Sequence, residues 1–336
     1  MSLLQSYRLR LARQRWRMRA MRKSSELEAV HIRTSRIRDE DILCCATLRN
    51  ELDRLPYFLK YYRELGIGHF LIVDNGSDDG STEYLAQQAD VSLWSTGASY
   101  KAARFGMDWM NRLLSRYGHN HWTLTVDPDE FFVYPFCDSR DLRALTHWLD
   151  ASSIRSFSAM LLDLYPRAAV GETRYVPGQD PVAATGWFDA GNYTIKRNEL
   201  YGNLWIQGGV RARTLFTEDP YRAPALNKIP LVKWHRRNVY VSSTHSLLPR
   251  GLNRVYDEWG GEKASGVLLH TKFLDVFETK AREEIDRQQH YADGFEYRAY
   301  ADRLRQRPSF WCDMSERYSG WQQLDSLGLM SRGNWA

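Results

Sequence analysis

Short apolar runs alternate with segments of helical spacing between residues 42 and 126. The apolar runs predict buried strands at 42–47, 69–73, 91–95 and 122–126. The intervening segments predict helices at 52–65, 81–89 and 102–117. Strand–helix–strand units of this length favour an α/β fold with a mostly parallel central sheet flanked by helices. Folds of this kind bind their ligands just beyond the carboxyl ends of the strands.

The fourth predicted strand ends in two carboxylates one residue apart. Side chains i and i+2 of a strand point the same way, so Asp127 and Asp129 can converge just past its end. Two carboxylates there suit Mg²⁺ or Mn²⁺, with substrate phosphates completing the coordination. The alternative is an acidic turn without a ligand, in which Pro128 simply ends the strand.

Polar residues also follow the first two predicted strands. Arg49 stands where the first helix begins, which is a suitable place for an anion. Asp74 ends the second strand and could accept hydrogen bonds from a base or ribose. Helix capping and turn formation explain the same residues without any ligand. Lys101 and Arg104, three residues apart in the third predicted helix, would share a face and could neutralise a diphosphate or be surface charges.

The formal net charge of +5 comes from one end of the chain. Residues 1–25 contain eight Arg and Lys and no acid, which leaves 38 basic against 41 acidic residues elsewhere. A nucleic-acid-binding protein would instead carry a basic face on the folded body, so we expect no nucleic-acid partner. The basic segment suits a tail, an interfacial helix on an anionic membrane surface through residues 1–25, or an arm for another partner.

Cysteine usage and hydropathy bear on the location. Four cysteines without a C-x-x-C pair indicate neither a disulfide framework nor structural zinc. No apolar run approaches the roughly 18 residues of a membrane span, and no secretory signal is evident. We therefore expect a cytoplasmic protein, with a peripheral position on the inner face of a membrane if the basic segment binds lipid.

The alternation weakens after residue 141. We predict a helix at 142–149 and long loops with short strands over 166–230. Further strands are predicted at 157–164, 239–243 and 267–270. Polar-faced helices are predicted at 277–291 and 297–305.

Three motifs together resemble the family 2-like group of glycosyltransferases with the GT-A fold. They are R-N-E at 49–51, D-N-G-S-x-D-G at 74–80 and D-x-D-E-F at 127–131. Segments 207–213 and 268–273 look like later signatures of the same group, so the resemblance covers residues 40 to 290. It implies metal-dependent, inverting transfer of a sugar from a nucleotide-sugar donor, with UDP favoured, to an acceptor hydroxyl, as in polysaccharide biosynthesis.

The resemblance also implies roles for individual residues. Donor contacts would come from Thr47, Arg49, Glu51, Asp74, Asn75, Lys101, Arg104 and Lys272. Metal ligands would be Asp127 and Asp129, with Mn²⁺ or Mg²⁺ as the cofactor. His270 is the candidate third ligand and His245 its rival.

Inverting transfer needs a carboxylate that deprotonates the acceptor hydroxyl. The resemblance places this base at Glu218 or Asp219, and Asp163 at the end of a predicted strand is the rival. Glu130 is a third candidate that more readily orients its neighbours. A different class of function, a non-catalytic GT-A-fold binding or membrane-associated scaffold protein, stays open.

On this interpretation the chain has four parts. A basic leader (1–38) precedes a nucleotide-sugar-binding half (39–140). An acceptor- and metal-completing half of the same domain follows (141–275), and the chain ends in a C-terminal helical extension (276–336).

Overall fold

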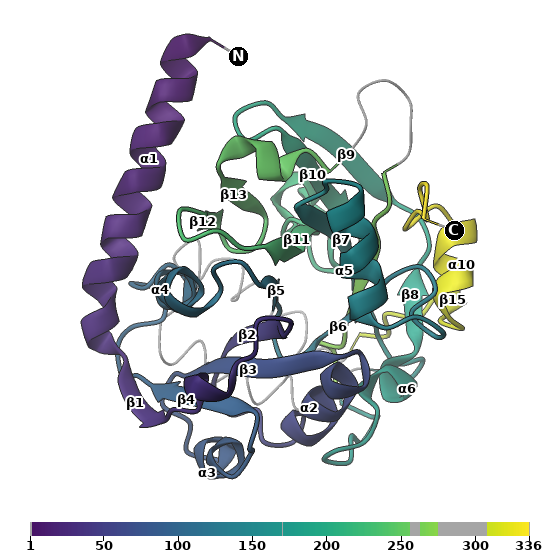
Figure 1. Ribbon diagram of the computed structural model, residues 1–336. Coiled ribbons are helices and arrows are strands. Elements are labelled where there is room, and N and C mark those ends of the chain that lie inside the picture. Colours follow the sequence, from purple (N-terminus) through teal and green to yellow (C-terminus); the bar gives the residue numbers. More distant parts are fainter. Residues whose placement is uncertain (1, 170, 256–262, 275–307, 336) are drawn as a thin grey trace.

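The computed structural model describes residues 2–169, 171–255, 263–274 and 308–335. Its centre is a nine-stranded sheet with the order β1-β4-β3-β2-β5-β11-β7-β14-β6 (Figure 1). These strands are β1 (Glu28–His31), β2 (Ile42–Leu48), β3 (Ile67–Asp74), β4 (Val91–Ser95), β5 (Trp122–Thr125), β6 (Glu130–Val133), β7 (Ser156–Asp163), β11 (Asn227–Lys233) and β14 (Gly266–His270). β2, β3, β4, β5, β7 and β14 run in one direction, whereas β1, β11 and β6 run the opposite way. The expected mostly parallel central sheet is thus present.

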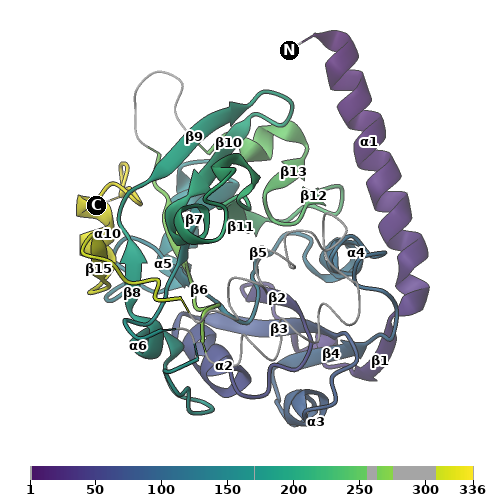
Figure 2. The same ribbon diagram turned by 180° about the vertical axis from the view of Figure 1, so that it is seen from behind.

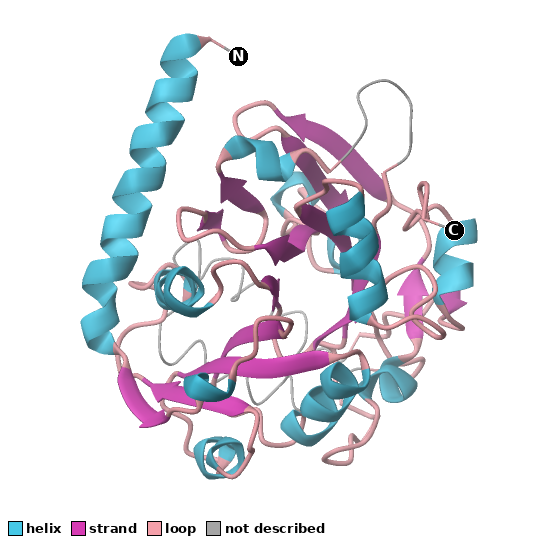
Figure 3. Cartoon of the chain, in the orientation of Figure 1, coloured by secondary structure: helices cyan, strands magenta, loops and turns pink. Residues whose placement is uncertain are grey.

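Helices cover both faces of this sheet. The longer ones are α1 (Leu3–Arg22), α2 (Leu55–Glu64), α4 (Met107–Tyr117) and α5 (Leu142–Ala151). The shorter ones are α3 (Ser81–Ala86), α6 (Pro181–Thr185), α7 (Gly209–Thr214) and α10 (Trp321–Ser326). Figure 3 shows the helices around the strands. Within the described ranges, none of the helices is long and apolar enough to cross a membrane.

Alternate residues of the central strands serve two separate cores. Cys44 in β2 packs in the cluster that includes α2 and α5, whereas its neighbour Cys45 packs in the cluster that includes α4. This is the two-residue period of a strand that is buried on both faces. The near-continuous apolar run at 42–46 is explained by this double burial.

Three two-stranded sheets complete the described part. The pairs are β9 (Tyr193–Asn198) with β10 (Asn203–Gly208), β12 (Val239–Ser242) with β13 (Ser246–Leu248), and β8 (Trp187–Asp189) with β15 (Ser315–Arg317). In Figure 2, seen from behind, β12 and β13 lie between the large sheet and α1. Short 3₁₀ turns are η1 (Lys23–Glu26), η2 (Thr34–Arg36), η3 (Pro220–Arg222) and η4 (Arg250–Asn253).

Three segments differ from the sequence prediction. The third helix was expected from residue 102, but it begins at Met107, because Arg104, Phe105 and Gly106 all have positive φ and cannot continue a right-handed helix. β6 and β11 were not predicted. β11 contains Pro230, and its pairing with β7 shifts register between Lys228 and Leu231, which hides the regular alternation of a strand.

The basic N-terminal segment is ordered. Residues 3–22 form α1, and β1 pairs with β4 to become the edge strand of the large sheet. The helices predicted at 277–291 and 297–305 lie outside the described residues.

Candidate functional site

Six strands end at the same edge of the large sheet. Their last residues are Leu48, Asp74, Ser95, Thr125, Asp163 and His270. From β2 the sheet extends through β3 to β4, and the chain then returns to place β5 on the other side of β2. Open α/β sheets bind ligands in the crevice beyond such a reversal. The oppositely directed β6 and β11 begin at this edge and contribute Glu130 and Lys228.

Asp127 and Asp129 lie just past the end of β5, as the sequence suggested, in the tight turn between β5 and β6. The amide of Glu130 donates to the carbonyl oxygen of Asp127 (3.0 Å), which closes the turn. The turn and metal-site interpretations are therefore compatible, because the turn itself presents carboxylates at the ligand-binding edge.

His270 contacts two carboxylates at once. Its Nδ1 is 2.6 Å from Oδ1 of Asp163, and its Nε2 is 3.3 Å from Oδ2 of Asp129. Asp163 also accepts a hydrogen bond from Nε of the buried Arg211 (2.7 Å). A metal-binding histidine usually donates the hydrogen of one ring nitrogen to a carboxylate. This contact orients the other ring nitrogen, which here faces Asp129.

The charges in this chain of contacts reinforce one another. Burial alone would lower the pKa of His270, but Asp129 and Asp163 raise it above its usual value. Burial would raise the pKa of both carboxyls, yet His270 holds the pKa of Asp129 well below its usual range, and Arg211 lowers the pKa of Asp163. The imidazole and the two carboxyls therefore favour one another's charged forms.

A second group of charges surrounds Asp127. Lys228, which is buried, donates to Oε1 of Glu130 (2.8 Å), and its Nζ lies 3.8 Å from Oδ2 of Asp127. The amide of Asp127 donates to the other Glu130 oxygen (3.2 Å). Glu130 thus orients its neighbours, in agreement with the role that the sequence favoured for it.

The carboxyl of Asp127 holds its proton more tightly than an ordinary aspartate. Desolvation in the crevice, followed by the charge of Glu130, raises the pKa of Asp127 to about 7. The side chain keeps 52% of its surface open to solvent. A cation that approaches this carboxyl would lower its pKa again.

The predicted donor loops hold each other in place. Asp74 accepts hydrogen bonds from the amide and hydroxyl of Ser77 and from the hydroxyl of Thr82. The amide of Asn75 donates to the carbonyl oxygen of Leu48, which ties this loop to the end of β2. These contacts are the turn chemistry that the sequence left open for this loop.

Arg49 and Glu51 also have partners within the protein. Arg49 donates to the carbonyl oxygens of Asn75 (3.1 Å) and Gly76 (2.5 Å). Glu51 pairs with the buried Arg54 (3.0 Å). Arg54 in turn contributes positive potential at Asp129, so this ion pair lies close to the acidic turn.

Lys101 and Arg104 do not share a helix face, because residues 101–106 form a turn before α4. Lys101 is exposed, whereas Arg104 donates to Asp108 (2.8 Å) and to the carbonyl oxygen of Val241 (2.8 Å). The expectation that these two residues share one helical face is therefore wrong. Lys272, by contrast, is half-buried just after β14 and attracts Asp129 electrostatically.

A pocket opens where β2 and β5 end. Its lining includes Thr47, Tyr100, Phe105, Asp127, Lys228 and Thr244. The buried hydroxyls of Thr47 and Thr244 have no hydrogen-bond partner among the described residues. Buried hydroxyls are nearly always satisfied in folded proteins, so these two mark a place where a polar ligand would find partners.

The remaining predicted site residues are His245, Glu218 and Asp219. His245 lies near Lys228, and its Nδ1 is 2.5 Å from the carbonyl oxygen of Asn227. Burial, followed by the charge of Lys228, lowers the pKa of His245 to about 3. Glu218 and Asp219 are exposed in the turn before η3, where Asp219 pairs with Arg222 (3.2 Å).

The donor set suits a hard divalent cation. Within the described ranges, no three His, Cys, Asp or Glu side chains are already grouped to hold a metal ion. Two carboxylates and one oriented imidazole nevertheless lie at one strand edge, and carboxylate with imidazole is a suitable donor set for Mn²⁺. The donor types of Asp127, Asp129 and His270 suit the predicted cation, but within the described ranges they are not assembled as a three-ligand group.

Sequence reasoning missed several charged residues near this edge. Arg54, Lys228 and Arg211 are each 6% exposed or less. A buried Arg or Lys implies a carboxylate partner, but the sequence alone does not show that these three residues are buried. The one available signal for Lys228 was its position within the apolar run at 226–232.

Comparisons with known proteins assign no family to this chain. No protein-family model matches the sequence, and no curated protein matches it. Solved structures that match include CMP:2-keto-3-deoxy-manno-octonic acid synthetase complexed with CTP, at 9% identity and a TM-score of 0.27. That match covers 80% of this chain and 86% of the other.

Proposed function

We propose that this chain is a divalent-metal-dependent glycosyltransferase of the GT-A type that uses a nucleotide-sugar donor. One observation carries the proposal: Nε2 of His270 faces Asp129 at 3.3 Å while its Nδ1 is held by Asp163. This arrangement presents an imidazole and a carboxylate together at the sheet edge that suits a nucleotide. The motif resemblance, with UDP as the favoured nucleotide, supports the same interpretation.

Three side chains would hold Mn²⁺ or Mg²⁺, namely Asp127, Asp129 and His270. The cation, when bound, would neutralise charge on the leaving diphosphate. Asp163 and Arg211 keep the imidazole in one orientation, with its proton on Nδ1. Arg54 and Lys272 add positive potential beside Asp129, which favours an anionic ligand at this edge.

A pocket lies beside the acidic turn, but its volume of about 10 Å³ is room for little more than one water molecule, so a nucleoside would enter only if the lining side chains moved. The unpartnered hydroxyls of Thr47 and Thr244 offer hydrogen bonds there. Tyr100 and Phe105, whose rings lie 5.8 Å apart, provide aromatic surface in the same pocket. Aromatic faces stack well on bases.

The acceptor base is proposed among the carboxylates outside the metal set. Asp163 is buried and engaged by both Arg211 and His270, so we assign it the positioning of His270 and not proton transfer. Asp219 and Glu218 are exposed and so accessible to an acceptor. They remain the candidates for the base.

The test is calorimetry with UDP, with and without Mn²⁺. We expect UDP to bind only when Mn²⁺ is present, and Asp129→Asn to abolish that binding. Asp39→Asn, at an exposed aspartate before β2 begins and so at the opposite end of that strand from the site, is the matched control and should bind as the unmodified protein does. Equal UDP binding with and without the metal would refute the proposal.

A second measurement separates an enzyme from a binding protein. A panel of nucleotide sugars is incubated with the protein and Mn²⁺, and release of the nucleotide is followed. A transferase should hydrolyse at least one donor slowly in water. Metal-dependent binding without release from any donor would favour the non-catalytic alternative.

A further inference from the structure

The outer side of α1 carries a stripe of exposed apolar side chains. They are Leu3, Leu4, Tyr7, Leu11, Met18 and Met21, each between 46% and 92% exposed. At about 100° of rotation per residue, all six fall within a sector of about 100° on one side of the helix, which also contains the polar Gln14 and Arg22. A stripe along a whole helix differs from the scattered apolar residues of an ordinary surface.

Exposed arginines flank this stripe. Arg8 and Arg15 lie along one side of it and Arg10 along the other. No acidic residue occurs before Glu26. Burial, followed by the charges of Arg17 and Arg10, lowers the pKa of Arg13.

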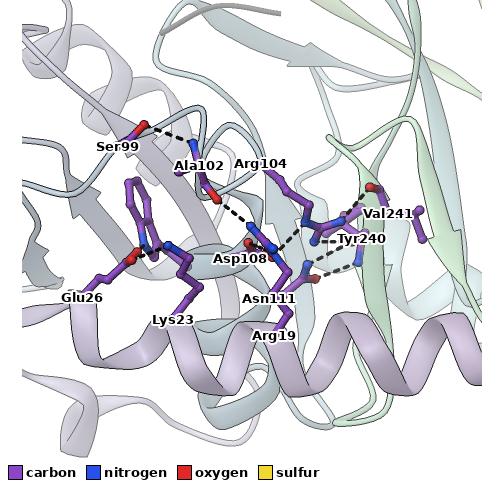
Figure 4. A network of polar contacts seen from close by, with 11 residues as sticks. Arg19, Lys23, Glu26, Ser99, Ala102, Arg104, Asp108, Asn111, Tyr240 and Val241 are labelled. Carbon is purple, nitrogen blue, oxygen red and sulfur yellow. Dashed lines mark hydrogen bonds and ion pairs between the residues drawn. The ribbon is translucent and has the colours of Figure 1, made fainter.

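The opposite side of α1 is docked on the protein. Ala20 is buried, and Arg19 donates to the buried Asp108 (2.7 Å) and to the carbonyl oxygen of Ala102 (2.6 Å). Arg104, which also pairs with Asp108, lies 4.0 Å over the ring of Trp16. Figure 4 shows how Arg19 and Arg104 meet at Asp108 beside the helix.

This docking fixes which side of α1 faces outward. The helix cannot turn its apolar stripe inward without breaking the contacts of Arg19 and Trp16. In Figure 1 and Figure 2, α1 runs along one flank of the molecule, and its N-terminal part extends beyond the body. The stripe is therefore a fixed surface about 30 Å long.

We propose that this outer face of α1 lies on an anionic lipid surface. Leu, Met and Tyr side chains would enter the boundary between headgroups and acyl chains, while the flanking arginines meet lipid phosphates. A second copy of the chain is a poorer occupant, because pairing two such faces would bring two sets of unneutralised arginines together. The inference does not depend on the proposed catalytic activity.

The test is co-sedimentation of the full chain with vesicles of phosphatidylglycerol and phosphatidylcholine. We expect binding to anionic vesicles and little binding to vesicles of pure phosphatidylcholine. Changing Leu4, Leu11 and Met18 together to Gln should reduce binding by about tenfold or more, because the apolar insertion is lost. Gln keeps a good helix former at each exposed position.

Matched variants identify the cause of any loss. Ile195→Gln with Leu200→Gln changes exposed apolar residues of the β9–β10 hairpin and should leave vesicle binding unchanged. Arg8, Arg15 and Arg22 changed together to Gln should remove the preference for anionic lipid. Thermal unfolding of each variant confirms that the fold is kept.

Two results would overturn the inference. One is equal vesicle binding by the unmodified protein and the α1 triple variant. The other is a dimer in sedimentation velocity that this variant abolishes, which would make the stripe an interface between copies. Either result leaves the metal-dependent binding of UDP untouched, so this failure is distinct from failure of the proposed function.

Discussion

Nε2 of His270 lies 3.3 Å from Oδ2 of Asp129, although 140 residues separate them in the sequence. The pairing of β14 with β6 brings them together, because it sets His270 opposite Glu130, the residue after Asp129. The amide of Thr271 also donates to the carbonyl oxygen of Asp129 (2.9 Å). The backbone thus fixes the distance between the acidic turn and the histidine before any ligand arrives.

Asp129→Asn and His270→Gln should each weaken Mn²⁺ binding by more than about 100-fold, because each removes a proposed ligand and not merely its support. Titration of the protein with Mn²⁺, followed by electron paramagnetic resonance of the free ion, measures the affinity directly. The exposed His147 supplies the control His147→Gln, which should bind Mn²⁺ normally. Unchanged affinity in the Asp129 variant would remove that residue from the ligand set.

Asp163→Asn distinguishes a positioning residue from a base. If Asp163 orients His270, the variant should need about 10- to 100-fold more Mn²⁺ for half-maximal donor turnover, and saturating Mn²⁺ should restore most of the rate. If Asp163 is the base, the Mn²⁺ requirement should be unchanged and the rate should stay low at any concentration. Thermal unfolding checks that the variant still folds, because Arg211 loses its carboxylate partner.

Asp219→Asn and Glu218→Gln address the base directly. Both residues are exposed, so we expect neither variant to lose stability or metal-dependent UDP binding. Transfer to an acceptor should fall by about 100-fold or more in the variant that lacks the base. Normal transfer by both would exclude this pair.

The sequence predicted the half of the site that depends on local order. Strand β5 and the acidic pair after it follow from apolar runs and alternation, and so does the carboxyl end of β14 with His270. The partners of these residues could not be predicted, because they come from pairings that join distant segments. Lys228 reaches Glu130 only because β11 inserts between β5 and β7, and the pattern of β11 is broken at Pro230.

The same distinction explains the error at residues 101–106. Lys101 and Arg104 have helical spacing to each other, and periodicity alone favours a helix there. The turn is instead stabilised by contacts of Arg104 with Asp108 and with β12. The contact with β12 joins residues 137 apart, and such a long-range contact overrides local propensity and leaves no trace in the spacing.

Acid should destabilise the protein partly through His69. This residue is buried in β3, with Nε2 2.8 Å from Oγ of Ser92, and burial lowers its pKa from 6.5. The unfolded state therefore binds a proton more readily, so the contribution of neutral His69 to stability is complete above pH 6.5 and is lost as the pH falls through its folded pKa.

The test compares the free energy of unfolding of the unmodified protein and His69→Gln, measured with urea at several pH values. Below pH 6.5 this free energy should fall less steeply in the variant, by up to about 1.4 kcal/mol per pH unit. His147→Gln should retain the full slope.

Arg19 should control how firmly α1 stays docked. Its side chain is 40% exposed but reaches Asp108, which is fully buried and also carries the pairing with Arg104. Arg19→Ala removes one of two cations from a buried carboxylate, so we expect the docked state of α1 to lose about 1 kcal/mol. Arg22→Ala, at an exposed position one turn away, should lose much less.

Hydrogen exchange of the α1 amides measures the difference, because undocking leaves an isolated helix that frays readily. Equal protection of α1 in both variants would show that the Arg19–Asp108 contact does not hold the helix on α4.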